Sequence, residues 1–249
     1  MKNILLGFLG FGLFMLVGCR KENTETGTQY GDGVNDIDGN TYESVIIVEQ
    51  QWMAENLRTT KYNDGSLIAN VKEDKQWVEL ETGAWCHYNN DSQNESSYGK
   101  LYNWYAAENE NLCPVGWHVP TGDEWTILKD YLAANGHAEK DGKALKSTSG
   151  WRQRNIISTG GGTDYYGWNG LPGGIRSNVD GRFYAVPGSL VSNASNVGKY
   201  GYCGSWLSLT NTKGWLFPGY SYSLSRKSDS LHEEISEREE GFSVRCLRD

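Results

Sequence analysis

At residues 112–125 the chain reads Leu112-Cys113-Pro114-Val115-Gly116-Trp117-His118-Val119-Pro120-Thr121-Gly122-Asp123-Glu124-Trp125. The end of this stretch contains a capping box, because the side chains of Thr121 and Glu124 can each bond a free amide of a first helical turn. Apolar residues then recur at helical spacing as far as Leu132, and Asn135-Gly136 supplies a left-handed stop. We therefore expect an amphipathic helix that begins after Thr121.

Short extended segments are expected on both sides of this helix. Residues 41–48 are rich in β-branched and aromatic side chains, and a turn at Glu49-Gln50 leads to 52–54 as the second arm of a hairpin. Residues 101–107 indicate a second helix that packs by its aromatic side. At the end of the chain, residues 242–247 alternate as a half-buried strand requires. The sequence thus favours an α+β fold with short antiparallel strands and two helices.

Glycine and proline shape the rest of the chain. From Gly150 onward, Gly160-Gly161-Gly162 and Leu171-Pro172-Gly173-Gly174 separate short aromatic segments, which predicts long loops. Near the start, residues 36–40 carry Asp, Asp and Asn in the order of the first calcium ligands of an EF-hand loop. The sixth position is Thr41 rather than glycine and the twelfth is Ile47 rather than glutamate. We interpret 36–40 as a simple turn.

The first nineteen residues have the layout of a bacterial lipoprotein leader. Lys2 precedes an apolar stretch from 4 to 17, which is shorter than the roughly 20 residues of a membrane-spanning helix. Leu16-Val17-Gly18-Cys19 resembles a lipobox. We therefore expect a signal peptide at 1–18, a lipid on Cys19 that attaches the chain to a membrane, a polar tether at 19–34, and one domain at 35–249. An ordinary secretory signal with a chance cysteine is the alternative.

Composition restricts the partners of this domain. The net charge of −8 disfavours binding to a phosphate backbone, so we expect no nucleic-acid partner. Ten tryptophans and fifteen tyrosines provide apolar mass for a core. The four histidines, at 87, 118, 137 and 232, are dispersed and lack zinc-site spacing, so no metal or other cofactor is expected.

Four cysteines remain once Cys19 is set aside, at positions 86, 113, 203 and 246. An even number in an exported chain favours disulfides. Four cysteines allow three pairings, and the residues alone leave all three open.

Several segments, in order along the chain, carry a resemblance to a known family: 52–65, 98–106, 112–121 with Glu124-Trp125, 171–174, and the closing Gly241-Phe242-Ser243-Val244-Arg245-Cys246. Together they resemble the Fibrobacter succinogenes major paralogous domain family, whose members are exported or lipid-anchored proteins of Bacteroidota and Fibrobacter. The resemblance covers nearly everything from residue 36 to 249. It implies a fold related to C-type-lectin-like and sulfatase-modifying-factor-like domains, and it implies no general activity.

The resemblance also bears on the cysteines and on known activities of related folds. In the lectin-like fold a cysteine near a helix is joined to one on the last strand, which implies a Cys113–Cys246 disulfide and leaves Cys86 for Cys203. Lectin activity does not carry over, because Trp168-Asn169-Gly170 lacks the final carboxylate of the calcium-binding motif. The reactive cysteine pair of the sulfatase-modifying relatives is not expected, because these four cysteines are better explained as structural.

The aromatic side chains of the loop-rich half could serve a surface or a core. Exposed aromatic rings stack on sugars or anchor protein interfaces. On this reasoning Trp168, Asn169, Arg176 and Trp215, which lie beside glycine-rich turns, are candidates for a ligand-binding surface. The alternative is that most of these rings fill a core that is poor in leucine and isoleucine.

The sequence therefore predicts a non-catalytic binding or adhesion module for a glycan or surface protein, displayed as an outer-membrane lipoprotein. No catalytic residue is predicted, because the nearest nucleophile pattern, Gly219-Tyr220-Ser221-Tyr222-Ser223, lacks its final glycine and Asp123 and Glu124 suit helix capping. An envelope enzyme of unidentified activity and a structural surface component are the alternatives.

Overall fold

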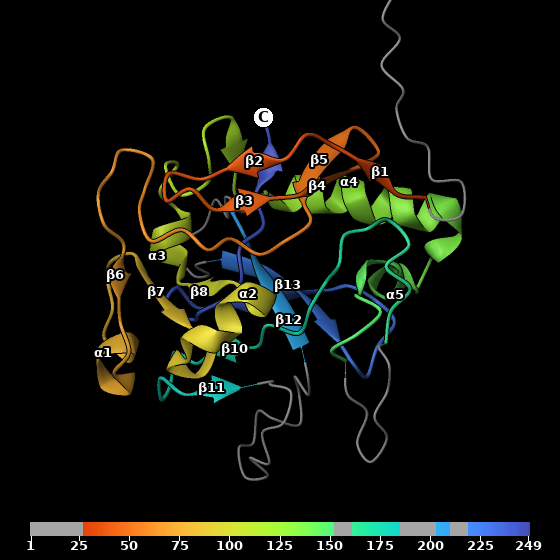
Figure 1. Ribbon diagram of the computed structural model, residues 1–249. Coiled ribbons are helices and arrows are strands. Elements are labelled where there is room, and N and C mark those ends of the chain that lie inside the picture. Colours follow the sequence, from red (N-terminus) through yellow and green to blue (C-terminus); the bar gives the residue numbers. More distant parts are fainter. Residues whose placement is uncertain (1–26, 152–160, 185–202, 210–218) are drawn as a thin grey trace, which may run out of the picture.

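A computed structural model of the chain describes residues 27–151, 161–184, 203–209 and 219–249. Its largest sheet has the strand order β1-β4-β5-β15-β9 and is antiparallel throughout. These strands are β1 (Gln29–Tyr30), β4 (Ser44–Ile47), β5 (Gln50–Met53), β9 (Trp117–His118) and β15 (Leu247–Arg248). Both ends of the described chain therefore meet on one sheet (Figure 1).

Four smaller sheets complete the strand structure of the described residues. A three-stranded sheet contains β12 (Cys203–Ser208), β13 (Gly219–Ser225) and β14 (His232–Ser236). Another contains β6 (Ala69–Asn70), β7 (Ala84–His87) and β8 (Lys100–Tyr102), and β6–β7 is the one parallel pair among the named strands. The remaining two are the pairs β2 (Val34–Asn35) with β3 (Thr41–Tyr42) and β10 (Ile175–Arg176) with β11 (Phe183–Tyr184). This mixture of small, mainly antiparallel sheets with helices confirms the α+β class.

The helix expected after Thr121 is present as α4 (Gly122–Leu132). Thr121 is its N-cap and both bonds of the capping box form, while Leu128 and Leu132 are buried with Trp125. Gly136 has a φ of 87°, in the left-handed region expected of a helix stop. The sequence prediction is confirmed here because every determinant of this helix is local.

The number of helices was underestimated. The described residues also contain α1 (Asp74–Val78), α2 (Glu95–Tyr98), α3 (Trp104–Ala107) and α5 (Asp141–Leu145). The expected helix at 101–107 is wrong in its first half, because residues up to Tyr102 belong to β8 and Asn103 caps α3 through its side chain. Such one-turn helices are set by tertiary contacts, and their apolar periodicity is too short to detect in a sequence.

The hairpin is confirmed as β4–β5, although the first predicted strand is interrupted at Glu43 and the turn lies at 48–49, so that Gln50 already belongs to β5. The closing segment differs more. Phe242, Val244 and Cys246 face one apolar cluster as predicted, but the intervening side chains are buried as well. Arg245, for example, contacts Trp168 and Trp206 of a second cluster. The segment runs between two cores, so it is buried on both faces rather than half-buried.

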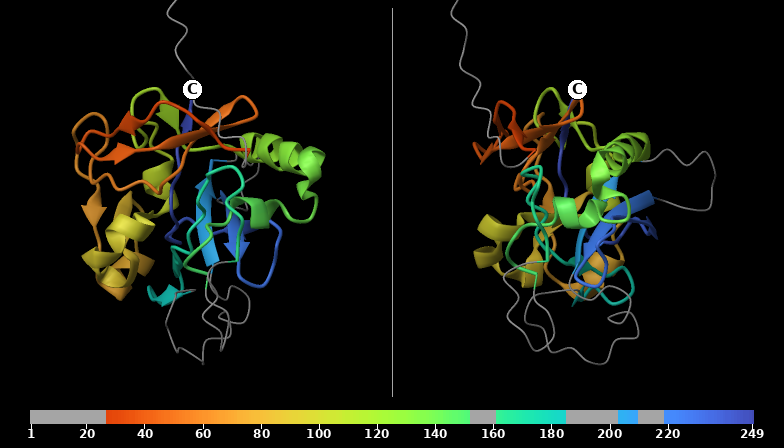
Figure 2. Two further views of the ribbon diagram at one scale, coloured as in Figure 1. Left: turned by 45° about the vertical axis from the view of Figure 1, so that its right-hand side comes forward. Right: turned by 90° about the vertical axis from the view of Figure 1, so that its right-hand side faces the viewer.

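Tryptophans fill much of the interior. The second cluster centres on Trp52, Trp125, Trp168 and Trp206, with ring centroids of neighbouring pairs 4.7–6.4 Å apart. It includes residues of α4 and of the β12–β13–β14 sheet, and Figure 2 shows this helix near one end of those strands. In the described part of the chain, no helix has the length and apolar character needed to cross a membrane.

Candidate functional site

The predicted binding surface is wrong for two of its four residues. Trp168 and Arg176 both have 0% of their surface exposed, and a fully buried ring cannot stack on a ligand at the surface. Asn169 is half-buried, and its backbone occupies a positive φ of 51°. Trp215 lies outside the described residues. The described members of the set therefore do not form a shared surface.

Trp168 is buried because it takes part in a cation–π contact in the core. The Arg245 guanidinium carbon lies 4.0 Å from the centre of the Trp168 ring. Arg245 also donates hydrogen bonds to the carbonyl oxygens of Trp168 and Asn169 and, at 2.9 Å, to Asn56 Oδ1. Asn56 Oδ1 in turn accepts a bond from Trp206 Nε1 at 2.9 Å. Arg245 thus joins the closing segment to two distant loops.

Arg176 has a similar structural role at the other end of the molecule. Its guanidinium carbon lies 4.4 Å from the Trp77 ring centre and 4.9 Å from that of Phe183. It donates to the carbonyl oxygens of Gly181, Val71 and Lys72 at 2.6–2.8 Å. An arginine between aromatic rings is stabilised inside a fold. No local pattern indicates this role, because Trp77 lies far from Arg176 in the sequence and only the fold brings them together.

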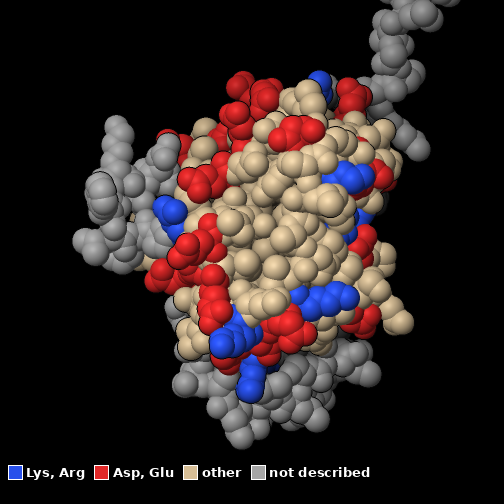
Figure 3. Space-filling model, turned by 90° about the vertical axis from the view of Figure 1, so that its left-hand side faces the viewer, with Lys and Arg blue, Asp and Glu red and all other residues tan. Residues whose placement is uncertain are grey.

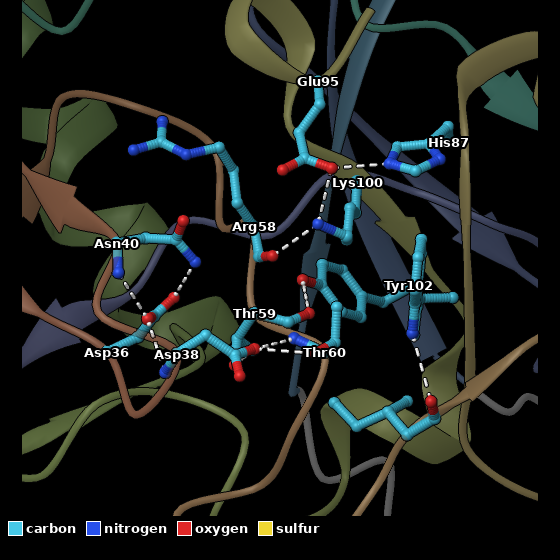
Figure 4. Close-up of polar contacts among 12 residues, drawn as sticks. Asp36, Asp38, Asn40, Arg58, Thr59, Thr60, His87, Glu95, Lys100 and Tyr102 are labelled. Atoms are coloured by element: carbon cyan, nitrogen blue, oxygen red, sulfur yellow. Dashed lines mark hydrogen bonds and ion pairs between the residues drawn. The ribbon is translucent and has the colours of Figure 1, made fainter. Parts of the chain in front are cut away.

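A polar cluster that the sequence did not indicate lies where α2 faces β7 and β8 (Figure 4). One oxygen of Glu95, Oε2, is 2.5 Å from His87 Nε2 and accepts a bond from Lys100 Nζ at 2.7 Å. Lys100 also donates to the Arg58 carbonyl oxygen at 2.6 Å and lies 4.8 Å from the Trp85 ring centre. These contacts join α2 to β7 and β8, and the bond from Lys100 also ties β8 to the distant Arg58.

The electrostatics of this cluster favour an ionised carboxylate. Burial acts to raise the pKa of Glu95, but hydrogen bonds from Lys100 and His87 outweigh burial and hold the pKa below its ordinary value. A carboxylate that remains ionised is an acceptor rather than a proton donor near neutral pH. The arrangement can hold a buried lysine and orient a histidine. The three side chains are near one another in the sequence, but they come from two strands and a one-turn helix, so only the fold shows that they converge.

The Asp36–Asn40 turn is confirmed as a turn whose carboxylates are already bonded within the protein (Figure 4). Asp36 accepts bonds from the Asp38 and Asn40 amides and from the Tyr42 hydroxyl at 2.6–3.0 Å. Burial acts to raise the pKa of Asp38, but bonds from Thr60 and Lys61 outweigh it and lower this pKa to about 2. Within the described ranges, no group of three or more His, Cys, Asp or Glu side chains is placed to hold a metal ion.

The cysteines are divided into one bridge and two thiols. Cys113 and Cys246 form a disulfide, as the resemblance implied. The expected partner pairing of Cys86 with Cys203 is absent from the structure, where both are free and buried. Cys86 lies on β7 and Cys203 lies on β12, and these two strands belong to different sheets. Burial raises the pKa of each to about 12, so neither is a reactive thiolate at neutral pH.

These features define an α+β domain that is closed by one disulfide and stabilised by buried cations over aromatic rings. The sequence model of one family, described as the Fibrobacter succinogenes major domain, matches residues 45–248. The chain belongs to this family. Comparisons with curated proteins and with solved structures find no match.

Proposed function

We propose that this protein is a lipid-anchored, non-catalytic binding or adhesion module of the cell envelope, and that it takes up a neutral glycan or a surface protein. The leader-like sequence ending at Cys19 supports the anchor. The net charge of −8 supports a partner other than nucleic acid. The expected place of action is the outer membrane.

The observation that carries the binding role is a broad uncharged area on one side of the molecule. Figure 3 shows this area in the centre of the face, with acidic side chains and some basic ones around its edge. The segment that leads into β6 lies on this side (Figure 1). Beyond the exposed Asp64, the exposed residues 65–67, 69 and 70 of this segment are uncharged, and Leu67 is 75% exposed.

The chemistry of this area suits a neutral ligand. Uncharged polar groups lose less hydration free energy on contact than charged ones do, and an apolar side chain among them adds buried area. A rim of mainly acidic charge disfavours anionic partners. Neutral glycans and uncharged protein surfaces meet these conditions.

Binding can be tested with the lipidated protein on glycan arrays and in pull-downs from envelope extracts. We expect Leu67→Glu to weaken binding strongly, because it places a charge in the exposed, uncharged run at 65–70 on this side of the molecule. Ile127→Glu is the matched control, since Ile127 is exposed on α4 at the opposite side of the molecule. Equal binding by the wild type and Leu67→Glu would contradict the assignment of this face.

The anchor has an independent test. Cys19→Ser removes the thiol that would receive lipid, so the variant should leave the membrane fraction or accumulate unprocessed. Protease treatment of intact cells then distinguishes a domain on the cell surface from one in the periplasm. Membrane partition that is unchanged by Cys19→Ser would contradict lipid attachment.

We further propose that the fold is related to C-type-lectin-like and sulfatase-modifying-factor-like domains. The Cys113–Cys246 disulfide supports this relation, because it joins the segment before α4 to the end of the chain. An experimental structure whose strand order matched neither domain class would contradict it.

A further inference from the structure

The first described residues contact a tyrosine cluster, which consists of Tyr165 and Tyr166 with His137. A Cβ atom on Gly27 would come within 2.6 Å of Tyr165 Cε1, so the backbone of Gly27 lies directly on that ring. Thr28 Oγ1 donates to the Tyr165 carbonyl oxygen at 3.1 Å. Gly27 and Thr28, the first described residues, are therefore held against this cluster.

The cluster presents aromatic surface to solvent. Tyr165 packs at 5.0 Å between ring centres against both Tyr166 and His137, and it remains 39% exposed. Tyr30, two residues beyond Thr28, is 56% exposed on β1. It pairs with Val45, whose side chain borders Gly167 next to the same cluster. Two partly exposed tyrosines thus flank the point where the chain enters the domain.

The length of chain between the lipid and the cluster is short. Cys19 and Gly27 are eight residues apart in the sequence. A fully extended chain spans at most about 3.5 Å per residue, which gives a reach of roughly 28 Å. Tyrosine rings are favoured at the level of lipid headgroups, because the ring is apolar and the hydroxyl remains hydrated.

We propose that the surface formed by Tyr30 and Tyr165 docks on the headgroup layer of the same bilayer that holds the lipid on Cys19. This proposal rests on the proposed lipid anchor. Docking fixes the orientation of the domain as well as its distance from the membrane. The β10–β11 end, which lies far from the chain entry in Figures 1 and 2, then points away from the bilayer.

Site-directed spin labelling of the lipidated protein in uncharged phosphatidylethanolamine–phosphatidylcholine liposomes tests the docking. Gln29→Cys places a label on exposed β1, and Val179→Cys places one in the exposed turn between β10 and β11. The native free thiols, Cys86 and Cys203, are buried and should not react. We expect access of a water-soluble relaxation agent to be several-fold lower at position 29 than at 179.

A second variant tests whether the tyrosines cause the shielding, or whether the short tether alone keeps position 29 near the bilayer. Adding Tyr30→Ser and Tyr165→Ser to the Gln29→Cys protein should restore access at position 29 without releasing the protein from liposomes. Equal access at 29 and 179 in liposome-bound protein would overturn the docking while leaving the anchor intact. Unchanged shielding in the serine variant would overturn the role of the tyrosines. Failure to bind liposomes at all would overturn the anchor and the docking together.

Discussion

Four long cationic side chains are buried among the residues that the structure describes, and each donates to backbone carbonyl oxygens. Lys100 donates to Arg58, and Lys146 donates to Ser225 and Ser228. Arg176 and Arg245 each bond carbonyls of separate loops. Carbonyls of irregular loops lack partners in a sheet or helix and need donors when they are buried. These side chains therefore supply the hydrogen bonds that a helix or sheet would otherwise provide, and they hold the loops in place.

A lysine should not be able to replace the forked guanidinium group of Arg245 without loss of stability. Arg245→Lys keeps the charge but cannot reach Asn56 and the two loop carbonyls together, so buried acceptors lose their donor. We expect the free energy of unfolding to fall by about 3 kcal/mol, measured by chemical denaturation. Arg248→Lys is the control, because Arg248 is exposed and should change stability by less than about 0.5 kcal/mol. Equal stability of both variants would contradict the role of the fork.

Val48 occupies a backbone conformation that disfavours a β-branched residue. It stands in the turn between β4 and β5 with a φ of 60°. The left-handed region costs an ordinary residue roughly 1–2 kcal/mol, whereas asparagine tolerates it in hairpin turns. We expect Val48→Asn to raise the free energy of unfolding by about 1 kcal/mol. Val115→Asn, at an exposed valine without a positive φ, should give no such gain, and equal gains would contradict the explanation.

At the scale of elements, the sequence predicted what is locally encoded. The capping box and the apolar spacing of α4 lie within a dozen residues, and this helix was predicted with its N-cap. The segment at 101–107 was predicted incorrectly as one helix, because Tyr102 belongs to β8, where it pairs with Trp85 of β7. Its aromatic residues suit a strand or a helix, and only the distant partner decides between them.

One histidine links two of these elements and should make stability depend on pH. His118 on β9 lies 2.8 Å from Glu124 of α4 and 2.6 Å from Asp249 after β15. The bond to Glu124 raises the pKa of His118 most, Asp249 adds to it, and together they outweigh burial to bring the pKa to about 9.

A raised folded-state pKa means that the folded protein binds this proton more tightly than the unfolded chain does. The stabilisation from His118 is therefore complete below about pH 6.5 and is lost as pH rises to about 9. We expect the melting temperature of the wild type to fall across this window more steeply than that of His118→Gln. His232→Gln, which replaces an exposed histidine bonded to Ser228, is the control. Parallel pH profiles for the wild type and His118→Gln would contradict the linkage.

At the scale of the whole molecule, the family and one disulfide were predictable, but the candidate site was not. The ordered segments from 52 to 246 carry the family resemblance, and that resemblance implied the Cys113–Cys246 pair. Burial is a property of the assembled fold, and Trp168 looks the same in sequence whether it is exposed or covered by Arg245. The uncharged face was not predicted either, because the sequence does not show which residues lie side by side on the surface.

The disulfide closes most of the domain into one loop, because 133 positions separate its cysteines. In the chain-entropy treatment a loop of this length lowers the entropy of the unfolded chain enough to stabilise the fold by roughly 5 kcal/mol. We therefore expect Cys113→Ala with Cys246→Ala to lose about that much in chemical denaturation. Cys86→Ala with Cys203→Ala is the matched control, because those residues are unbridged in the structure and should lose only packing. Alkylation of the denatured mature protein, without reductant, should modify two cysteines. Modification of none would show that Cys86 and Cys203 are bridged in solution, and an unfolding free energy unaffected by loss of the Cys113–Cys246 pair would contradict its stabilising role.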